Sequence, residues 1–270
     1  MNRIAQKFEQ LRSAGRKGFI PFVSAGDPDL QTTLTIITTL AESGADIIEL
    51  GVPFSDPMAD GPVIQASSQR ALEAGTRLTD ILELVRTFRT KSDTPIVLFS
   101  YLNPIYRFGI ERLAFEAASA GIDGVLITDV VDAEAAEISL QLRKLGVDLI
   151  SLIAPTTSDE RLERIAGSAA GFIYAVARAG VTGVTQNTGN AAEALVNRVR
   201  RYTELPIAVG FGISTADQIE AVWKYADAAV VGSAIVAVIE RARTPADAVY
   251  DVSRFVRQLV PRFAKSTEET

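Results

Sequence analysis

The chain has 270 residues, 47% of them hydrophobic, which allows one large domain or two small ones with a sizeable core. Its formal net charge is −6 and its isoelectric point is about 4.9, so nucleic acid and anionic membranes are poor candidates as partners. No apolar stretch approaches the ~20 residues of a membrane span, and the N-terminus lacks the apolar core of a signal peptide. We therefore expect a soluble cytoplasmic protein.

Two absences limit the chemistry. The chain has no cysteine, which excludes disulfides, thiolate nucleophiles and zinc–sulfur sites. It has no histidine either, so the usual general base and the usual transition-metal ligand are missing. None of its lysines falls in a predicted apolar strand, where an imine-forming lysine would be activated. Any proton transfer must therefore use Asp, Glu, Tyr, Lys or water.

The first elements are a helix and a strand. Apolar residues at helical spacing predict an amphipathic helix over residues 4–11, and an apolar run with β-branched and aromatic residues predicts a strand over 19–24. Asp27 is the predicted N-cap of the next helix, with Pro28 at the first helical position.

A unit then repeats along the chain. A helical pattern ends at a glycine or another small residue, an aspartate follows within two positions, and a short apolar strand begins. The aspartates of this repeat are Asp46, Asp123, Asp148 and, in a weaker version, Asp227. Including the first strand, eight apolar strands are predicted, starting at Phe19, Ile47, Ile96, Val125, Leu149, Phe172, Ile207 and Ala228. Helical patterns follow them, for example over residues 132–145, with Ile138, Leu142 and Leu145 on one face.

This alternation predicts an α/β fold. Strands that alternate with helices pair in parallel, and continuously apolar strands are buried on both faces. Eight such units in about 250 residues indicate a single (β/α)8 TIM barrel, with an extra N-terminal helix and short extra helices. A doubly wound open sheet is the alternative, because the pattern alone cannot prove closure. No linker divides the chain, so we expect one domain over residues 1–270 with a frayed tail over about 263–270.

Glu49 is the first candidate for chemistry, because it lies inside the apolar strand that begins at Ile47. An isolated buried carboxylate is strongly penalised unless it is paired or takes up a proton. A loop rich in Pro, Gly and Asp follows and ends at a second carboxylate, Asp60. The ends of barrel strands and the loops after them are where barrel enzymes keep acid/base residues. The plainer alternatives are a hydrogen-bonded structural Glu49 and a turn residue at Asp60.

Glycine-bearing segments follow three late strands, at residues 178–183, 210–214 and 232–233. Backbone N–H groups at a helix N-terminus bind phosphate, and barrels often place a phosphate site after strands 7 and 8. The sequence therefore predicts a phosphate site here, with tight turns as the plainer interpretation.

Other residues near the predicted strand ends are ambiguous. Tyr101 and Tyr174 could line a pocket or simply pack. Asp129 is another candidate carboxylate or a loop cap, and Asp56 fits a turn residue.

The sequence from Glu49 to Gly61, ELGVPFSDPMADG, resembles the signature of the tryptophan synthase alpha subunit family. The resemblance continues at residues 21–28, 179–183, 210–214 and 232–233, and it extends to about Arg262. It implies a (β/α)8 barrel that cleaves indole-3-glycerol phosphate to indole and glyceraldehyde 3-phosphate, a carbon–carbon lyase of tryptophan biosynthesis.

The resemblance also implies roles for individual residues. Glu49 would be the general acid/base, and Asp60 would interact with the indole N–H. The phosphate would lie against Gly183, Gly212, Gly232 and Ser233. Phe22, Leu126, Tyr174 and Phe211 would border the indole, and Thr182 would close over it. Apart from the resemblance, the loops 53–60 and 178–190 are long and rich in glycine and small polar residues, and we expect them to close as lids.

Partners and cofactors follow from the same resemblance. It implies a tryptophan synthase beta subunit as partner, in an alpha2beta2 heterotetramer, with pyridoxal phosphate only in that partner and neither cofactor nor metal in this chain. Three alternatives stay open: a free-standing lyase with no obligate partner, a non-catalytic phosphate-binding barrel that regulates a partner, and an unrelated phosphosugar isomerase using two carboxylates.

Overall fold

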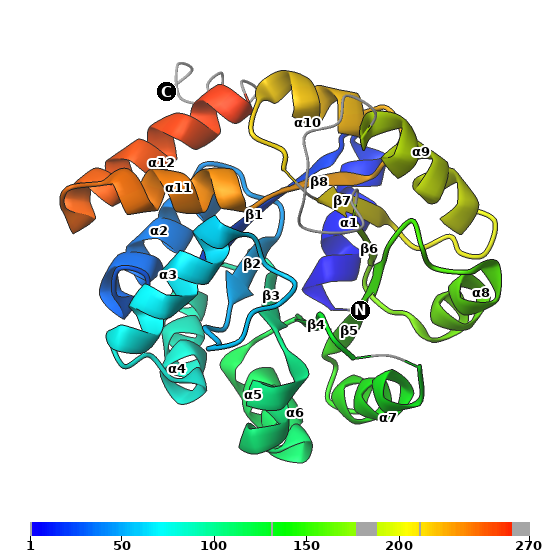
Figure 1. Ribbon diagram of the computed structural model, residues 1–270, viewed down its shortest axis with the longest axis horizontal. Helices are drawn as coiled ribbons and strands as arrows, with labels where there is room; N and C mark the ends of the chain where they lie inside the picture. The colour runs from blue at the N-terminus through cyan, green and yellow to red at the C-terminus, as the bar shows by residue number, and fades with distance from the viewer. Residues whose placement is uncertain (1, 131, 177–187, 211, 261–270) are drawn as a thin grey trace.

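Eight parallel strands close into a barrel in chain order, and β8 pairs with β1 (Figure 1). The computed structural model describes residues 2–130, 132–176, 188–210 and 212–260, with only the backbone for 132 and 188–190. The strands are β1 (Gly18–Ser24), β2 (Ile48–Gly51), β3 (Ile96–Ser100), β4 (Gly124–Ile127), β5 (Asp148–Ile153), β6 (Ile173–Val176), β7 (Ile207–Gly210) and β8 (Ala228–Val231). The predicted closed barrel is confirmed, and the open sheet is excluded.

Helices form a ring around this barrel (Figure 1). Within the described residues they are α1 (Arg3–Ser13), α2 (Leu30–Glu42), α3 (Pro62–Glu73), α4 (Leu78–Arg89), α5 (Leu102–Phe108), α6 (Ile110–Ala120), α7 (Asp132–Arg143), α8 (Asp159–Ser168), α9 (Thr188–Val199), α10 (Ala216–Trp223), α11 (Ser233–Arg241) and α12 (Pro245–Leu259). The extra helices that the sequence predicts are α1, which precedes β1, and the second helix in each of the pairs α3–α4, α5–α6 and α11–α12. No helix in this described part of the chain has the length and apolar character required to span a bilayer.

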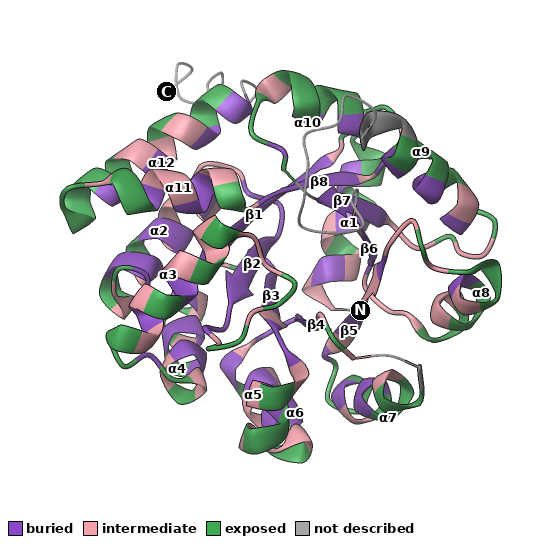
Figure 2. Cartoon of the chain, in the orientation of Figure 1, coloured by how far each residue is buried: buried purple, intermediate pink, exposed green. Residues whose placement is uncertain are grey.

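The strands are buried on both faces, as their continuous apolar sequences predict (Figure 2). One set of side chains fills the barrel interior, and a larger set packs between the strands and the helices. Helix α1 belongs to the interior set, because Ile4, Phe8 and Leu11 pack with the residues inside the barrel. The ring of Phe8 lies 5.7 Å from that of Phe172. The N-terminal helix therefore closes the N-terminal end of the barrel and leaves the opposite end for a site.

The repeated aspartates also lie at the N-terminal end of the barrel. Three of them precede a strand and accept a hydrogen bond from the first or second backbone N–H of a neighbouring strand. Asp46, Asp123 and Asp227 accept at 2.9, 2.9 and 2.8 Å, from Phe19, Ile96 and Ile207. Asp148 differs, because its carboxylate accepts from the side-chain amide of Asn2. Asp46, Asp123 and Asp227 therefore each join two neighbouring strands at this end of the barrel.

Two local predictions were wrong. Asp27 does not cap α2; Asp29 does, with its side chain accepting from the N–H of Thr32 at 2.7 Å. Asp27 is buried and paired with Arg70 instead. The helix after β4 ends at Arg143, and the chain turns through Gly146 at a φ of 79°. Leu145 therefore lies beyond the helix and is 46% exposed rather than on its buried face.

Candidate active site

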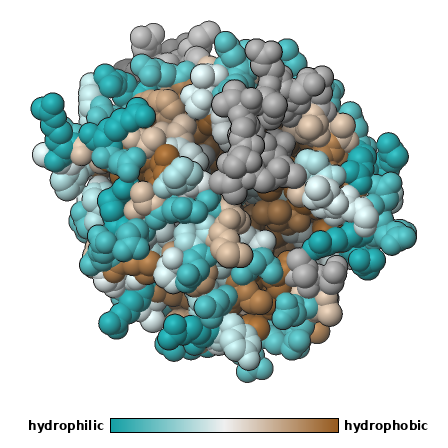
Figure 3. All heavy atoms as spheres, in the orientation of Figure 1, coloured by the Kyte–Doolittle hydropathy of each residue, from teal (hydrophilic) through white to brown (hydrophobic). Residues whose placement is uncertain are grey.

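A cavity of about 610 Å³ opens at the C-terminal end of the barrel. Figure 3 shows hydrophobic atoms near the middle of one face of the molecule, among hydrophilic side chains. The lining of the cavity comes from strand ends and the loops after them. The described residues around it are Phe22, Glu49, Met58, Ala59, Asp60, Gly61, Pro62, Ile64, Phe99, Thr128, Leu152, Ala154, Thr156, Tyr174, Val176, Gly212, Val230, Gly232 and Ser233. Both predicted carboxylates therefore face one cavity.

Glu49 lies in the middle of β2, in register with Phe22 of β1 and Val97 of β3. Its side chain is 1% exposed, and neither carboxylate oxygen has a hydrogen-bond partner in the described part of the chain. Removal from water penalises the charged form, so burial raises the pKa of Glu49 to about 8. At neutral pH this side chain is mostly a neutral acid that can give up a proton. The alternative of a hydrogen-bonded structural carboxylate does not fit this geometry.

Asp60 lies on the loop after β2, just before α3. The Tyr101 hydroxyl donates to its carboxylate at 3.0 Å and accepts from the backbone N–H of Ala59 at 2.9 Å. Burial raises the pKa of Asp60 to about 6, although the Tyr101 hydrogen bond lowers it. The two carboxylates of the cavity therefore differ, and at neutral pH Asp60 is mostly ionised while Glu49 is mostly protonated.

An aromatic wall borders the carboxylates. Phe22 and Phe99 meet edge to face with ring centroids 5.4 Å apart, and the Phe99 and Tyr174 centroids are 6.5 Å apart. Glycines make room for these rings, because a Cβ on Gly51 would lie 2.6 Å from the Phe22 ring and one on Gly210 would lie 2.2 Å from the Tyr174 hydroxyl oxygen. The wall fits a flat apolar group beside two carboxylates of different charge.

Glycines and a helix N-terminus form another part of the lining. Gly232 is the N-cap of α11, and Ser233 is its first helical residue. Gly212 lies in the loop after β7 at a φ of 73°, a left-handed conformation that favours glycine. A helix N-terminus presents unpaired N–H groups and positive partial charge, which suit a phosphate. The structure thus brings the two described glycine segments of the predicted phosphate site to one cavity.

The comparisons with known proteins agree with this geometry. Residues 8–263 match the family model for the tryptophan synthase alpha chain. Two similar relatives are tryptophan synthase alpha chains from Geobacter sulfurreducens, 49% identical over 96% of this chain and 98% of the relative, and from Polynucleobacter asymbioticus, 45% identical over the same shares. This chain belongs to the tryptophan synthase alpha chain family.

Solved structures of the family have the same fold. Tryptophan synthase subunit alpha from Legionella pneumophila is 36% identical, with a TM-score of 0.87 over 97% of this chain and 99% of the other. A variant of the alpha subunit from Pyrococcus furiosus is 39% identical, with a TM-score of 0.83 over 90% and 98%. The family resemblance seen in the motifs therefore extends over the whole barrel.

Several residues that the family motifs single out do not line the described cavity. Leu126 is fully buried in the barrel interior, in the same cluster as Tyr174 and Val230 of the lining, but it does not itself line the cavity. Tyr101 contacts the cavity through its hydrogen bond to Asp60. Thr182, Gly183 and Phe211, and most of the predicted lid over 178–190, lie outside the described residues. The other predicted lid, residues 53–60, is held by α3, because the Ser68 hydroxyl accepts from the N–H of Phe54 at 2.9 Å.

Other lining residues were missed by the sequence analysis. Phe99, Leu152 and Val176 come from the apolar runs of β3, β5 and β6, and Thr156 follows β5. A strand's apolar run does not say which of its residues point into the barrel end, so only their places near strand ends could have indicated them. Asp129 does not line the cavity; it accepts from the N–H of Leu102 at the start of α5 at 2.7 Å.

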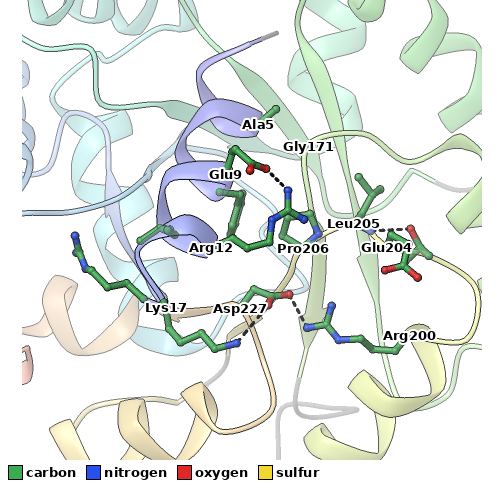
Figure 4. Close-up of a pocket in the computed structure, with 15 residues that line it drawn as sticks. Ala5, Glu9, Arg12, Lys17, Gly171, Arg200, Glu204, Leu205, Pro206 and Asp227 are labelled. Carbon is green, nitrogen blue, oxygen red and sulfur yellow. Dashed lines mark hydrogen bonds and ion pairs between the residues drawn. The ribbon is translucent and has the colours of Figure 1, made fainter.

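A second cavity, of about 780 Å³, lies at the N-terminal end of the barrel (Figure 4). It is formed by α1 and by loops that lead into β1, β6, β7 and β8. Several of its charged groups pair with one another: Asp227 accepts from Lys17 at 3.4 Å and from Arg200 at 2.6 Å, and Arg12 pairs with Glu9. This cavity is larger but has no buried acid without a partner, so we assign the chemistry to the C-terminal end.

Proposed function

We propose that this member of the family cleaves indole-3-glycerol phosphate in the cavity above β2, with Glu49 as general acid and base. The reaction is a retro-aldol cleavage, in which the indole ring carbon gains a proton and the side-chain hydroxyl loses one. A protonated Glu49 gives its proton to the ring carbon. The resulting carboxylate then takes the hydroxyl proton as the carbon–carbon bond breaks, which returns Glu49 to its starting state. The observation that carries this proposal is a buried carboxyl that has no hydrogen-bond partner among the described residues and a pKa of about 8.

Asp60 has the complementary role. Protonation of the ring carbon places positive charge on the indole nitrogen, and a carboxylate that is ionised at neutral pH stabilises that charge. The pKa of Asp60, about 6, supports this role. The Tyr101 hydroxyl fixes the orientation of the carboxylate through its hydrogen bond.

The rest of the cavity matches the two ends of this substrate. Phe22, Phe99 and Tyr174 border the indole, and the N-terminus of α11 with Gly212 receives the phosphate. Binding energy from the phosphate holds the reacting carbon beside Glu49 although the phosphate does not react. The reaction uses side chains of this chain alone, without a cofactor or metal.

The proposed partner is a tryptophan synthase beta subunit, which carries pyridoxal phosphate and receives the indole, in a cytoplasmic alpha2beta2 assembly. The names of the related proteins support a partner, because they describe alpha chains. A free-standing lyase is the alternative. It predicts equal rates with and without the beta subunit.

Indole release from indole-3-glycerol phosphate tests these roles. Glu49→Gln is expected to lower kcat by about 10²–10⁴-fold, the usual contribution of a general acid/base. Ser233→Asp is expected to raise KM, because it places negative charge beside the phosphate. Asp56→Asn is the matched control: this exposed carboxylate lies on the same loop as Asp60 but does not line the cavity. A Glu49→Gln enzyme with unchanged kcat would contradict the proposal, and no activity in any variant or mixture would leave a non-catalytic phosphate-binding barrel.

A further inference from the structure

Arg70 lies on α3 and joins three elements behind the cavity. Its Nε and Nη2 donate to the two carboxylate oxygens of Asp27 at 2.8 and 2.9 Å, a bidentate pair with the loop between β1 and α2. Its Nη1 donates to Glu240 of α11 at 2.9 Å. Arg70 itself does not line the cavity.

Each of the three elements carries a wall of the cavity. Helix α3 begins at Pro62, directly after Asp60, and α11 begins at Ser233, in the proposed phosphate site. The loop that holds Asp27 follows strand β1 directly, and β1 carries Phe22 of the aromatic wall. Helices α3 and α11 pack against each other. The Arg70 guanidinium therefore connects α3, which follows Asp60, to α11, whose N-terminus would bind the phosphate.

The Asp27 half of this connection is built into the protein interior. The Asp27 side chain is only 2% exposed, whereas most ion pairs among the described residues have a more exposed acid. A planar guanidinium that makes two parallel hydrogen bonds to one carboxylate fixes both distance and orientation. A second buried contact between the same elements supports it, because the hydroxyls of Ser24 and Ser67 lie 2.6 Å apart.

We propose that Arg70 is a positioning residue, which sets the separation between the Asp60 end and the phosphate end of the cavity through Asp27 and Glu240. This inference rests on the proposed roles of Asp60 and α11. A substrate that spans both ends binds productively only if their separation matches its length, so a change of about 1 Å far from the chemistry can cost about 100-fold in rate. A ligand that occupies one end only is indifferent to that separation.

The test uses Arg70→Met with three probes in isothermal titration calorimetry: indole, glycerol 3-phosphate, and an uncleavable analogue in which a plain three-carbon chain joins indole to phosphate. We expect Arg70→Met to weaken the spanning analogue by about tenfold or more and to leave each fragment within about twofold. Indole release should fall by about 10–100-fold in kcat/KM. Arg70→Lys, which keeps the charge but loses the bidentate geometry, should recover part of the loss, and Glu240→Gln, which removes only the α11 contact, should cause a smaller one.

Arg86 supplies a matched control. It lies on α4, its side chain is 34% exposed against 33% for Arg70, and it also pairs with two acids, Glu83 at 2.9 Å and Glu116 at 2.7 Å. Arg86→Met removes a comparable cluster of ion pairs away from the cavity. It should leave the affinity for all three probes and kcat/KM unchanged.

The results separate positioning from stability. Equal loss for the fragments and the spanning analogue, no loss for any probe, or the same loss in Arg86→Met would overturn the positioning role. Glu240→Gln keeps the inference testable if Arg70→Met fails to fold. Ser233→Asp in an otherwise wild-type chain tests the underlying site: if it leaves glycerol 3-phosphate binding intact, the proposed phosphate position is wrong whatever Arg70 does.

Discussion

The two ends of the barrel treat carboxylates in opposite ways. At the N-terminal end, Asp46, Asp123 and Asp227 accept backbone hydrogen bonds and pair with cations. At the C-terminal end, Glu49 is as buried as Asp46 and Asp123, but neither of its oxygens has a partner among the described residues. The same functional group therefore stabilises the fold at one end and stays available for proton transfer at the other. What distinguishes them is the set of groups around the carboxylate, since burial is common to both.

Among these carboxylates, a substitution at Asp123 should have the largest effect on the free energy of unfolding. It is 3% exposed and accepts from the N–H of Ile96, from Arg89 at 2.7 Å and from Arg3 at 3.0 Å. Asp123→Asn leaves the largely buried Arg89 without its counter-charge, which should lower the free energy of unfolding by about 3–5 kcal/mol. Urea denaturation measures it. A loss below about 1 kcal/mol would show that the N-terminal carboxylates are not structural supports.

Glu49→Gln should instead raise the free energy of unfolding. The pKa of Glu49 rises from 4.5 to about 8 on folding, so between these values the folded chain holds a proton that the unfolded chain has released. Wild-type stability therefore falls as pH rises through this window, by up to about 1.4 kcal/mol per pH unit, and the stability that protonated Glu49 provides is fully present only below about pH 4.5. The glutamine variant lacks this slope and should be more stable by about 3 kcal/mol at pH 7, the slope taken over the interval from 4.5 to 7.

The measurement is urea unfolding of both proteins from pH 6.5 to 8. Asp60 titrates mostly below this range, because its pKa is about 6. Identical pH slopes for wild type and Glu49→Gln would contradict a raised pKa at Glu49.

Activity should follow both carboxylates of the C-terminal end. Without a partner subunit, kcat/KM should rise as pH increases through about 6, because Asp60 ionises, and fall above about 8, because Glu49 loses its proton. Each limb should approach a tenfold change per pH unit. A pH series of indole release measures the profile. An optimum that extends flat beyond pH 9 would contradict Glu49 as an initial acid.

Tyr101→Phe should produce the smallest change. In the wild type, the Tyr101 hydroxyl donates to Asp60 at 3.0 Å, and this hydrogen bond lowers the pKa of the Asp60 carboxyl. The substitution removes the hydroxyl and therefore the hydrogen bond. The pKa of Asp60 should rise further, and the acid limb of the pH profile should move upward by less than about one unit while the alkaline limb stays in place. Tyr106→Phe, on the exposed surface of α5, is the control. An acid limb that does not move would mean that Tyr101 only packs.

The barrel could be predicted because its strands are short, apolar and separated by helical patterns, so each element follows from local sequence. Glu49 was found for the same reason, since a charge stands out in an apolar strand. Contacts between distant residues could not be read this way. Tyr101 and Asp60 meet because neighbouring strands end side by side. Asp27 was misassigned because Asp29 offers the same capping chemistry, and only the folded chain brings Arg70 to Asp27.

The protonation state of Glu49 is the central claim, and carboxyl ¹³C NMR tests it most directly. Spectra of glutamate-labelled wild type and Glu49→Gln differ by the Glu49 resonance, which can be followed from pH 4 to 10 below the unfolding transition. The structure predicts a midpoint near 8, raised by burial from the ordinary 4.5. A midpoint near 4.5 would mean that Glu49 is ionised at neutral pH. It would then contradict the assignment of this residue as the acid that starts the cleavage.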